Sequence, residues 1–376
     1  MGNSIRLFRV KGIDIRVHIT FPLILVWAAI QFGWLNGLGM DGAIFGIIVT
    51  LLLFSIVVLH ELGHSIAALN YGVPVKQIVL LPIGGVAQLA RMPEKPVQEF
   101  VIAIAGPLVN VGLAVIFGIV GILAGFNLTI GNLSSSMLDI ANASFSSVFA
   151  YVFISNLFLA GFNLLPAFPM DGGRVLRALL ATRMSYPRAT AIAVTIGQGM
   201  AWLLGLYGFL GGGFFMVLIA IFIFVGAGQE GQLVQLRSVL GGLQVQQAYS
   251  RRAQTLSPES TLKDAIDLTL NSFQADFPVC DGTNLIGIIT HTRLVQALNA
   301  YPPDTLVRDV MVEDIPYVSP NEGLFEVQKR FSEFGVDALP VVEGGKFLGI
   351  ITTKDLNEVY QLLSKKPDLL STPNTI

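Results

Sequence analysis

The chain has 376 residues, of which 53% are hydrophobic and only 13% carry a charge, whereas average soluble proteins carry roughly 25%. This shortage of charge excludes a disordered chain and argues against an ordinary soluble enzyme. The single cysteine, Cys280, excludes a disulfide framework and a cysteine-based zinc site. The net charge of −2 gives no general attraction to nucleic acid, so no nucleic-acid partner is expected.

Charge is distributed unevenly along the chain. Residues 1–228 contain 11 Lys and Arg against 7 Asp and Glu, whereas residues 229–376 contain 12 against 18. The first part therefore has a net charge of +4 and the second part −6. This difference, together with the change in hydrophobicity, indicates two physically different units.

The first unit consists mainly of long apolar runs. A helix needs about 20 apolar residues to cross a bilayer. The sequence therefore predicts a polytopic α-helical membrane protein with about six transmembrane helices, which has the lipid bilayer as its surroundings. The six runs lie near residues 18–36, 43–69, 99–125, 147–166, 189–208 and 212–228.

Lysine and arginine orient these runs. They occur before the first run, between the second and third, and between the fourth and fifth. The alternate loops, 37–42, 126–146 and 209–211, contain none. Cytoplasmic loops collect Lys and Arg. The pattern therefore predicts that both the N-terminus and the C-terminus are cytoplasmic.

The second run ends with the motif His60-Glu61-Leu62-Gly63-His64. Residues four apart share one face of a helix, so the two histidines can bind one metal ion, with a carboxylate beside them. Charged groups in a membrane helix cost roughly 2.5–3.5 kcal/mol and are usually functional. The alternative is that these side chains hydrogen-bond between helices or relay protons.

Asp171 is the candidate third ligand, because hydrolytic zinc usually has three protein ligands. It follows the fourth run, where Pro166 and Pro169 interrupt the helix and Gly172-Gly173 permit a sharp turn. The predicted orientation brings the ends of the second and fourth runs to the same, cytoplasmic, side. Alternatively, Asp171 is a turn residue, since Asp-Gly is a common turn pair.

The histidine motif, with Asn163-Leu-Leu-Pro and Asp171-Gly-Gly in a later run, resembles the site-2 protease family, zinc metalloproteases that cut substrates within the membrane. The resemblance covers residues 1–228. It implies one bound Zn²⁺ with His60, His64 and Asp171 as ligands, and Glu61 as the catalytic acid and base. It also implies that Asn163 helps to hold the substrate or the oxyanion.

Two more segments resemble this family. Gly84, Gly85 and Val86 match a re-entrant strand that pairs with unfolded substrate, although an ordinary surface hairpin is the alternative, because Gly-Gly is a general turn signal. The segment Ala105-Gly106-Pro107-Leu-Val-Asn110 opens the third run. Close helix packing at the small Gly106 is sufficient to explain it.

The second unit contains an internal repeat. Residues 255–294 align without a gap on residues 317–356, with 11 of 40 positions identical. Each copy predicts a turn, a helix, a strand, a turn, a strand and a helix. We place a linker at 229–244, the first copy at 245–306, the second at 307–365 and a tail at 366–376.

The repeat resembles a tandem pair of cystathionine-β-synthase (CBS) domains, an α/β module. The resemblance implies that Thr290, Thr352 and Asp355 contact an adenine nucleotide, namely ATP, ADP or AMP. The first copy has Arg293 in place of the aspartate. Alternatively, Asp355 caps a helix. Pairs of this kind also imply a homodimer.

Together these features predict an intramembrane zinc endopeptidase that cuts transmembrane segments of membrane-anchored proteins under nucleotide control, in a prokaryotic plasma membrane. A transporter or channel with a nucleotide-sensing tail is the main alternative. An inactive relative that binds membrane partners is a second. The intact Glu61 argues against the second, because a scaffold needs no proton acceptor.

Overall fold

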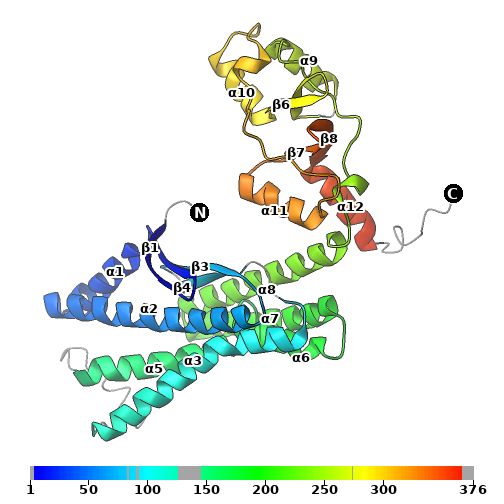
Figure 1. The fold of residues 1–376 in the computed structure, drawn as a ribbon. Helices are drawn as coiled ribbons and strands as arrows, with labels where there is room; N and C mark the ends of the chain where they lie inside the picture. The colour runs from blue at the N-terminus through cyan, green and yellow to red at the C-terminus, as the bar shows by residue number, and fades with distance from the viewer. Residues whose placement is uncertain (1–3, 83, 90–92, 126–144, 273, 366–376) are drawn as a thin grey trace. The chain divides into compact units, whose positions relative to one another are not determined.

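The computed structural model describes residues 4–82, 84–89, 93–125, 145–272 and 274–365 (Figure 1). The chain divides into two units, Met1–Gly231 and Gln232–Ile376.

Helices dominate the first unit, and proline lies in the first turn of three of them, α1, α3 and α7. Proline suits this position because the N–H that it lacks would have no intrahelical partner there. The helices are α1 Pro22–Ala29 with η1 Ile30–Leu35, α2 Gly39–Asn70, α3 Pro96–Leu123, α5 Phe145–Asn163, α6 Asp171–Ala181, α7 Tyr186–Tyr207 with η2 Gly208–Gly212, and α8 Phe214–Leu240.

Four helical segments in the described residues are long and apolar enough to cross a membrane, and two apolar segments are shorter. All six coincide with predicted apolar runs, so a polytopic helical membrane fold is confirmed, while the count of about six spans stays a prediction. The long segments are Gly39–Asn70, Pro96–Leu123, Tyr186–Gly212 and Phe214–Leu240, and the shorter ones are Pro22–Leu35 and Val148–Asn163.

The last helix is longer than the apolar run that predicts it. The run near 212–228 is followed by helical structure up to Leu240, so most of the segment 229–244 is part of α8. Leu240 is fully buried in the core of the second unit, with Leu236 and Val239 packed beside it. Apolar residues at helical spacing thus extend the helix beyond the apolar run.

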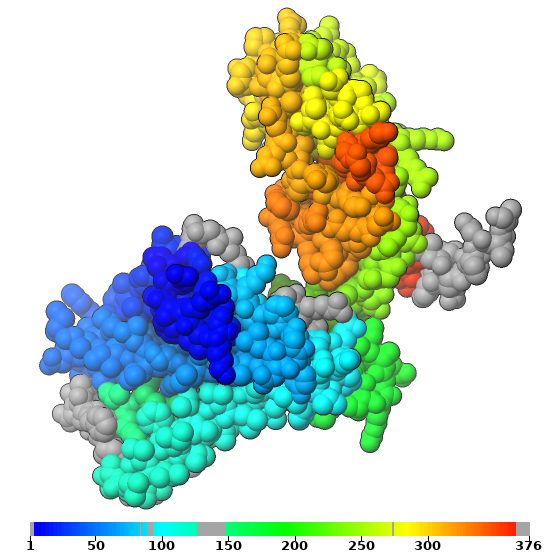
Figure 2. Space-filling view, viewed as in Figure 1, coloured from blue at the N-terminus to red at the C-terminus, as the bar shows by residue number. Residues whose placement is uncertain are grey.

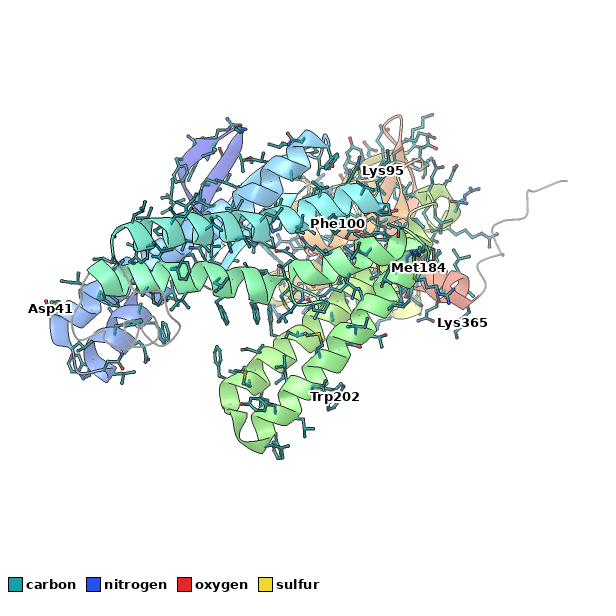
Figure 3. All side chains as sticks on the ribbon, turned by 90° about the horizontal axis from the view of Figure 1, so that it is seen from below. Asp41, Lys95, Phe100, Met184, Trp202 and Lys365 are labelled. Atoms are coloured by element: carbon teal, nitrogen blue, oxygen red, sulfur yellow. The ribbon has the colours of Figure 1, made fainter. Side chains whose placement is uncertain are left out.

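The helices of the first unit pack in a chain of contacts. Helix α2 packs against α3, α3 against α5 and α6, and α6 against α7. In Figure 3, Lys95 before α3 and Met184 before α7 lie at one end of this bundle, and Asp41 at the start of α2 lies at the other. The loops that carry the basic residues between these helices therefore share an end.

A four-stranded sheet lies beside α2 in the order β1-β2-β3-β4 (Figure 1). Strands β2 and β3 are parallel, and the other two pairs are antiparallel. Buried Ile13, Ile15 and Ile78 pack with Phe54 and Val58 of α2. The hairpin formed by β1 and β2 lies on the surface (Figure 2). The strands are β1 Ser4–Val10, β2 Ile13–His18, β3 Val75–Leu81 and β4 Gly84–Leu89.

The second unit has the predicted helix, strand, strand and helix in each copy of the repeat. Its four strands form one sheet in the order β5-β6-β8-β7. The elements are α9 Leu262–Asn271, β5 Phe277–Asp281, β6 Asn284–Ile289 and α10 His291–Ala300 in the first copy, and α11 Leu324–Phe334, β7 Ala338–Glu343, β8 Lys346–Thr352 and α12 Thr353–Lys365 in the second.

The two copies exchange their leading segments. Val245, in the turn η3 Val245–Gln247, donates its N–H to the carbonyl of Glu322 in the second copy. Val307, in the turn η4 Val307–Asp309, donates its N–H to the carbonyl of Ser260 in the first. Each copy therefore completes the core of the other, and the two fold as one module.

Candidate metal and catalytic site

Two histidines of α2 meet in the interior of the first unit. The side chains of His60 and His64 are one helical turn apart, both 6% exposed, and their Nε2 atoms are 3.1 Å apart. The Nδ1 atom of His64 lies 2.7 Å from the carbonyl oxygen of Ile102 on α3. Because a carbonyl only accepts, Nδ1 carries the proton and Nε2 keeps a free lone pair.

Asp171 joins these histidines from a distant part of the chain. It is the first residue of α6, and its Oδ2 lies 3.2 Å from Nε2 of His60 and 3.1 Å from Nε2 of His64. The three predicted ligands are thus brought together, across sequence separations of 107 and 111 residues. In the described residues they form a group of buried donors suited to a metal ion.

The spacing of the three donor atoms fits zinc. Ligand atoms at 2.0–2.1 Å from a tetrahedral ion stand about 3.3 Å apart, and the three atoms here are 3.1 to 3.2 Å apart. Two imidazoles and one carboxylate are a donor set that zinc uses in hydrolytic sites, with the fourth position left for water. The residues present therefore fit the metal that the sequence predicts.

Gly106 of α3 borders the candidate metal site. A methyl group at this position would collide with Nε2 of His64 and would lie 2.7 Å from Nε2 of His60. The sequence explains Gly106 by helix packing alone, but the structure shows that its missing side chain leaves room at the donor atoms. The signal for this role was the Ala-Gly-Pro motif itself, although nothing local pointed to the histidines.

Gly172 and Gly173 act differently from the prediction of a sharp turn. Both lie in the first turn of α6. A methyl group at residue 172 would collide with the carbonyl oxygens of Leu164 and Leu165, and one at residue 173 would lie 2.6 Å from the amide nitrogen of Phe168. The glycine pair therefore lets the segment 164–168 fold back against the helix. Asp171 begins a helix and is not a simple turn residue.

Glu61 lies next to the two histidines and below the strand β4. It is half-buried. A methyl group at Gly85 would lie 3.0 Å from Cγ of Glu61 and 2.9 Å from Cγ1 of Val57. In the described residues β4 is an edge strand, paired with β3 alone, and Val86 is 47% exposed. The predicted catalytic acid therefore lies against a strand whose outer edge is available for pairing with another strand.

Asn163 has a separate environment. It is the last residue of α5, is half-buried, and its Nδ2 donates to the carbonyl of Leu159, one turn earlier, at 3.0 Å. This hydrogen bond lies within its own helix and does not involve the His60, His64 and Asp171 cluster. The predicted role of Asn163 at the substrate stays a prediction.

The predicted nucleotide-binding residues occupy helix N-termini. Thr290 caps α10, where its hydroxyl accepts the N–H of Arg293 at 3.2 Å. Asp355 accepts the N–H of Thr352 at 2.8 Å and its hydroxyl at 2.7 Å. Arg293 donates its Nε–H to the carbonyl of Val310. Helix capping accounts for the contacts of Thr290, Thr352 and Asp355, and nucleotide binding stays a prediction.

Asp276 is a titratable group near the first of these caps that sequence reasoning missed. Its Oδ1 accepts the N–H of His291 at 3.0 Å. Burial raises the pKa of Asp276, the hydrogen bond from His291 opposes this change, and the negative charge of Asp337 adds to it. The module therefore contains a carboxyl group whose ionisation works against folding.

Comparison with known proteins identifies the families to which the two units are similar. A family model described as Peptidase family M50 matches residues 48–204, and the CBS domain model matches residues 245–300 and 307–361. A zinc metalloprotease of Methanocaldococcus jannaschii is 34% identical over 370 residues, which cover 98% of this chain and 99% of the relative.

Two further comparisons cover parts of the chain. Stage IV sporulation protein FB of Bacillus subtilis is 28% identical over 156 residues, or 41% of this chain and 48% of that protein. The solved structure of a site-2 protease from Methanocaldococcus jannaschii is 41% identical, covers 61% of this chain and 95% of that chain, and has a TM-score of 0.44.

A buried cluster of two histidines and an aspartate in apolar helices, together with zinc metalloprotease relatives along the whole chain, defines a metalloprotease that works within the membrane. The chain belongs to peptidase family M50, the site-2 proteases, and carries tandem CBS domains. Its relatives indicate an integral membrane protein of prokaryotes, and the predicted enzyme class is confirmed. The alternatives of a transporter, a channel or an inactive scaffold are set aside.

Proposed function

We propose that this protein cuts peptide bonds in the transmembrane segments of membrane-anchored substrates, with His60, His64 and Asp171 holding Zn²⁺ and Glu61 as the acid and base. The observation that carries the proposal is the set of separations between the three donor atoms, 3.1 to 3.2 Å, directly beside a carboxylate that remains free of the cluster. Such a set suits hydrolysis and has no evident use in a passive helix contact.

Each residue has a defined chemical task in this proposal. Zinc, when bound, supplies a Lewis acid that polarises the scissile carbonyl and makes water more acidic. Glu61 takes the proton of the attacking water and returns it to the departing amide nitrogen. The hydrogen bond to Ile102 fixes the ring of His64. Asn163 turns from Leu159 to hold the substrate carbonyl or the oxyanion.

The substrate reaches Glu61 in an extended form. The carbonyls of a transmembrane helix are occupied by internal hydrogen bonds, so the helix must unwind before attack. Gly84, Gly85 and Val86 lie on the edge strand β4, against Glu61. An unwound segment that adds to this edge would gain backbone hydrogen bonds and would present its peptide bonds to the acid and base.

A cleavage assay combined with zinc analysis tests the proposal. Purified protein is incubated with a single-pass membrane peptide, and its zinc content is measured. We expect Glu61→Gln to keep zinc and lose cleavage, and His60→Ala to lose both. His18→Ala is the matched control, because His18 bonds to Thr20 outside the cluster. Parental cleavage by Glu61→Gln would contradict the assigned role.

The proposal extends to topology and regulation. Both termini are cytoplasmic, in a prokaryotic plasma membrane. The chain consists of a membrane unit at 1–228, a linker at 229–244, CBS copies at 245–306 and 307–365, and a tail at 366–376. The tail, residues 366–376, lies outside the described residues. The CBS pair binds ATP, ADP or AMP through Thr290, Thr352 and Asp355, mediates homodimerisation, and changes the cleavage rate through α8.

Nucleotide control has its own test. The cleavage rate is measured while AMP or ATP is raised to saturation, in the parent and in Asp355→Ala. We expect a change of rate in the parent that Asp355→Ala abolishes, because one ligand must favour one of two states to regulate. An unchanged parental rate over the whole range would remove nucleotide control and leave the protease assignment intact.

A further inference from the structure

Arg177 is a buried cation that takes no direct part in the proposed chemistry. It lies on α6, six residues after Asp171, and is 1% exposed. Its Nε and Nη2 atoms contact Oε1 of Glu99 on α3 at 2.7 and 2.5 Å, and its Nη1 donates to Oε1 of Glu230 on α8 at 2.6 Å. One side chain thus joins three helices.

Burying these ion pairs costs free energy of desolvation, so their presence indicates a specific role. Buried ion pairs rarely stabilise more than well-packed apolar side chains of the same volume. Here Glu99 is fully buried and its Oε2 has no hydrogen-bond partner within the described residues. Arginine suits the position because its planar fork can bind two carboxylates at once. The distribution of Lys and Arg between the apolar runs, which gives the predicted orientation, does not reveal this burial.

Arg177 also contacts the segment that leads to Asp171. Its guanidinium carbon lies 4.9 Å from the centre of the Phe168 ring and 4.8 Å from that of Tyr186. Phe168 is fully buried and is three residues before Asp171. The arginine therefore lies on the helix that Asp171 begins and also contacts the loop that precedes it.

Helix α8 packs against the same loop. A methyl group at Gly226 would lie 2.8 Å from Cδ of Pro169, and Gly226 is one turn before Glu230. A methyl group at Gly197 of α7 would lie 3.2 Å from Cα of Ala167. The segment 164–170 is therefore enclosed by α7 and α8, and the ion pair between Arg177 and Glu230 ties α8 to α6.

We propose that Arg177, Glu99 and Glu230 are positioning residues that fix Asp171 relative to His60 and His64. The ion pairs set where α6 begins, and this in turn sets where Oδ2 of Asp171 lies. The proposal rests on the proposed function of these three residues as zinc ligands. It makes the site dependent on two carboxylates that touch neither the metal nor the substrate.

Metal binding by the full-length purified protein tests this proposal. The dissociation constant for Zn²⁺ is measured by competition with a chelator, and the visible absorption of bound Co²⁺ reports its coordination geometry. Melting temperature is followed in parallel. The variants are Arg177→Gln, Arg177→Lys and Glu230→Gln. Arg183→Gln is the matched control, because Arg183 is exposed in the turn that follows the same helix, two residues after its end at Ala181.

We expect Arg177→Gln and Glu230→Gln to bind Zn²⁺ about tenfold or more weakly, in the range found for partners that orient metal ligands, and to change the Co²⁺ spectrum. Arg177→Lys keeps the charge but loses the fork, so it should restore part of the affinity. Arg183→Gln should match the parent in all three measurements.

A purely structural role has a different signature. If Arg177→Gln and Glu230→Gln lower the melting temperature but retain the parental Zn²⁺ affinity and Co²⁺ spectrum, the proposal is wrong. If Arg177→Gln does not fold, Glu230→Gln and Arg177→Lys decide by the same criterion. A parent that binds neither ion would instead overturn the zinc site itself.

Discussion

Gly106 leaves space for the donor atoms of the candidate metal site because it has no side chain. Gly106→Ala would place a methyl group against Nε2 of both His60 and His64. We expect zinc affinity to fall at least tenfold and cleavage to fall with it, because a displaced ring cannot reach the ion. Zinc content and cleavage of the membrane peptide provide the measurement.

Gly112 supplies the matched control for this substitution. It lies on the same helix, α3, and a methyl group there would have nothing within 4 Å. Gly112→Ala should therefore retain both zinc and activity. Full zinc occupancy in Gly106→Ala would show that the donor atoms tolerate an added methyl group.

A second prediction at the scale of one residue concerns pH. Because burial raises the pKa of Asp276 above its ordinary value of 3.8, its protonated form favours folding. The stability that protonated Asp276 contributes is fully present at pH values below the pKa of this residue in the unfolded chain. It is lost as the pH rises through the higher pKa of Asp276 in the folded chain. Asp276→Asn keeps the acceptor for His291 and removes the charge.

The measurement is thermal unfolding of the second unit between about pH 3 and 8, a range that includes the ordinary pKa of Asp. We expect the melting temperature of Asp276→Asn to exceed that of the parent near neutral pH, and the difference to shrink below about pH 4. Equal melting temperatures across the range would contradict a buried, destabilised carboxylate.

A site residue can be predicted from the sequence when the pattern that marks it lies within a short segment of the chain. His60, Glu61 and His64 form a motif within about one turn of one helix, and the predicted topology brings the carboxylate of Asp171 to the same end. The roles of Gly106 and Arg177 depend on which residues of different helices face each other. That register is set by packing, and no pattern within α3 or α6 encodes it.

At the scale of elements, strand β4 is the one whose position has a direct functional test. Gly85→Ala would press a methyl group against Cγ of Glu61 and Cγ1 of Val57. We expect cleavage to fall about tenfold or more, as for other misplacements near the chemistry, while zinc content is unchanged. Gly112→Ala on α3 serves as the control, because a methyl group there would meet nothing within 4 Å. Loss of zinc in Gly85→Ala would point to a collapsed site.

The amino-terminal hairpin is not among the elements predicted for the first unit. The sequence contains the signs of two strands, since Ile13, Ile15 and Val17 alternate with polar residues after the pair Lys11-Gly12. Both residues of this pair have positive φ, 47° and 88°, as a tight hairpin turn requires. The parallel pairing of β2 with β3 joins segments some 60 residues apart, which no local pattern encodes.

At the scale of the whole molecule, the second unit depends on residues that precede the repeat. Leu240, the last residue of α8, is fully buried among residues of the second copy. Leu240→Ala should destabilise this unit by about 2–5 kcal/mol, the usual cost of such a cavity. Leu233→Ala, at a position 51% exposed, should change stability by less than about 0.5 kcal/mol.

Denaturant unfolding of the second unit, followed in the full-length protein, measures this difference. If the two substitutions have equal effects, Leu240 does not belong to the folding core of the module.

The division into a membrane unit and a CBS pair was predictable because charge and hydrophobicity change together along the chain. The exchange of η3 and η4 between the copies was not, because a repeat in the sequence marks similar segments and carries no information on which copy each segment completes. Alignment thus located the repeats, and only three-dimensional pairing shows how they are assembled.

The unbroken helix α8 has a mechanical consequence. Glu230 and Leu240 are ten residues apart on this helix, which is about 15 Å along the helix axis. An α-helix turns by about 100° per residue, so a single residue added between them would swing one end around the axis by that angle. Seven added residues would complete nearly two full revolutions and bring the original faces back into phase. If α8 transmits a rotation between its two ends, the cleavage rate across a series of such insertions should rise and fall with the helical repeat. It should not decline steadily with the number of residues added.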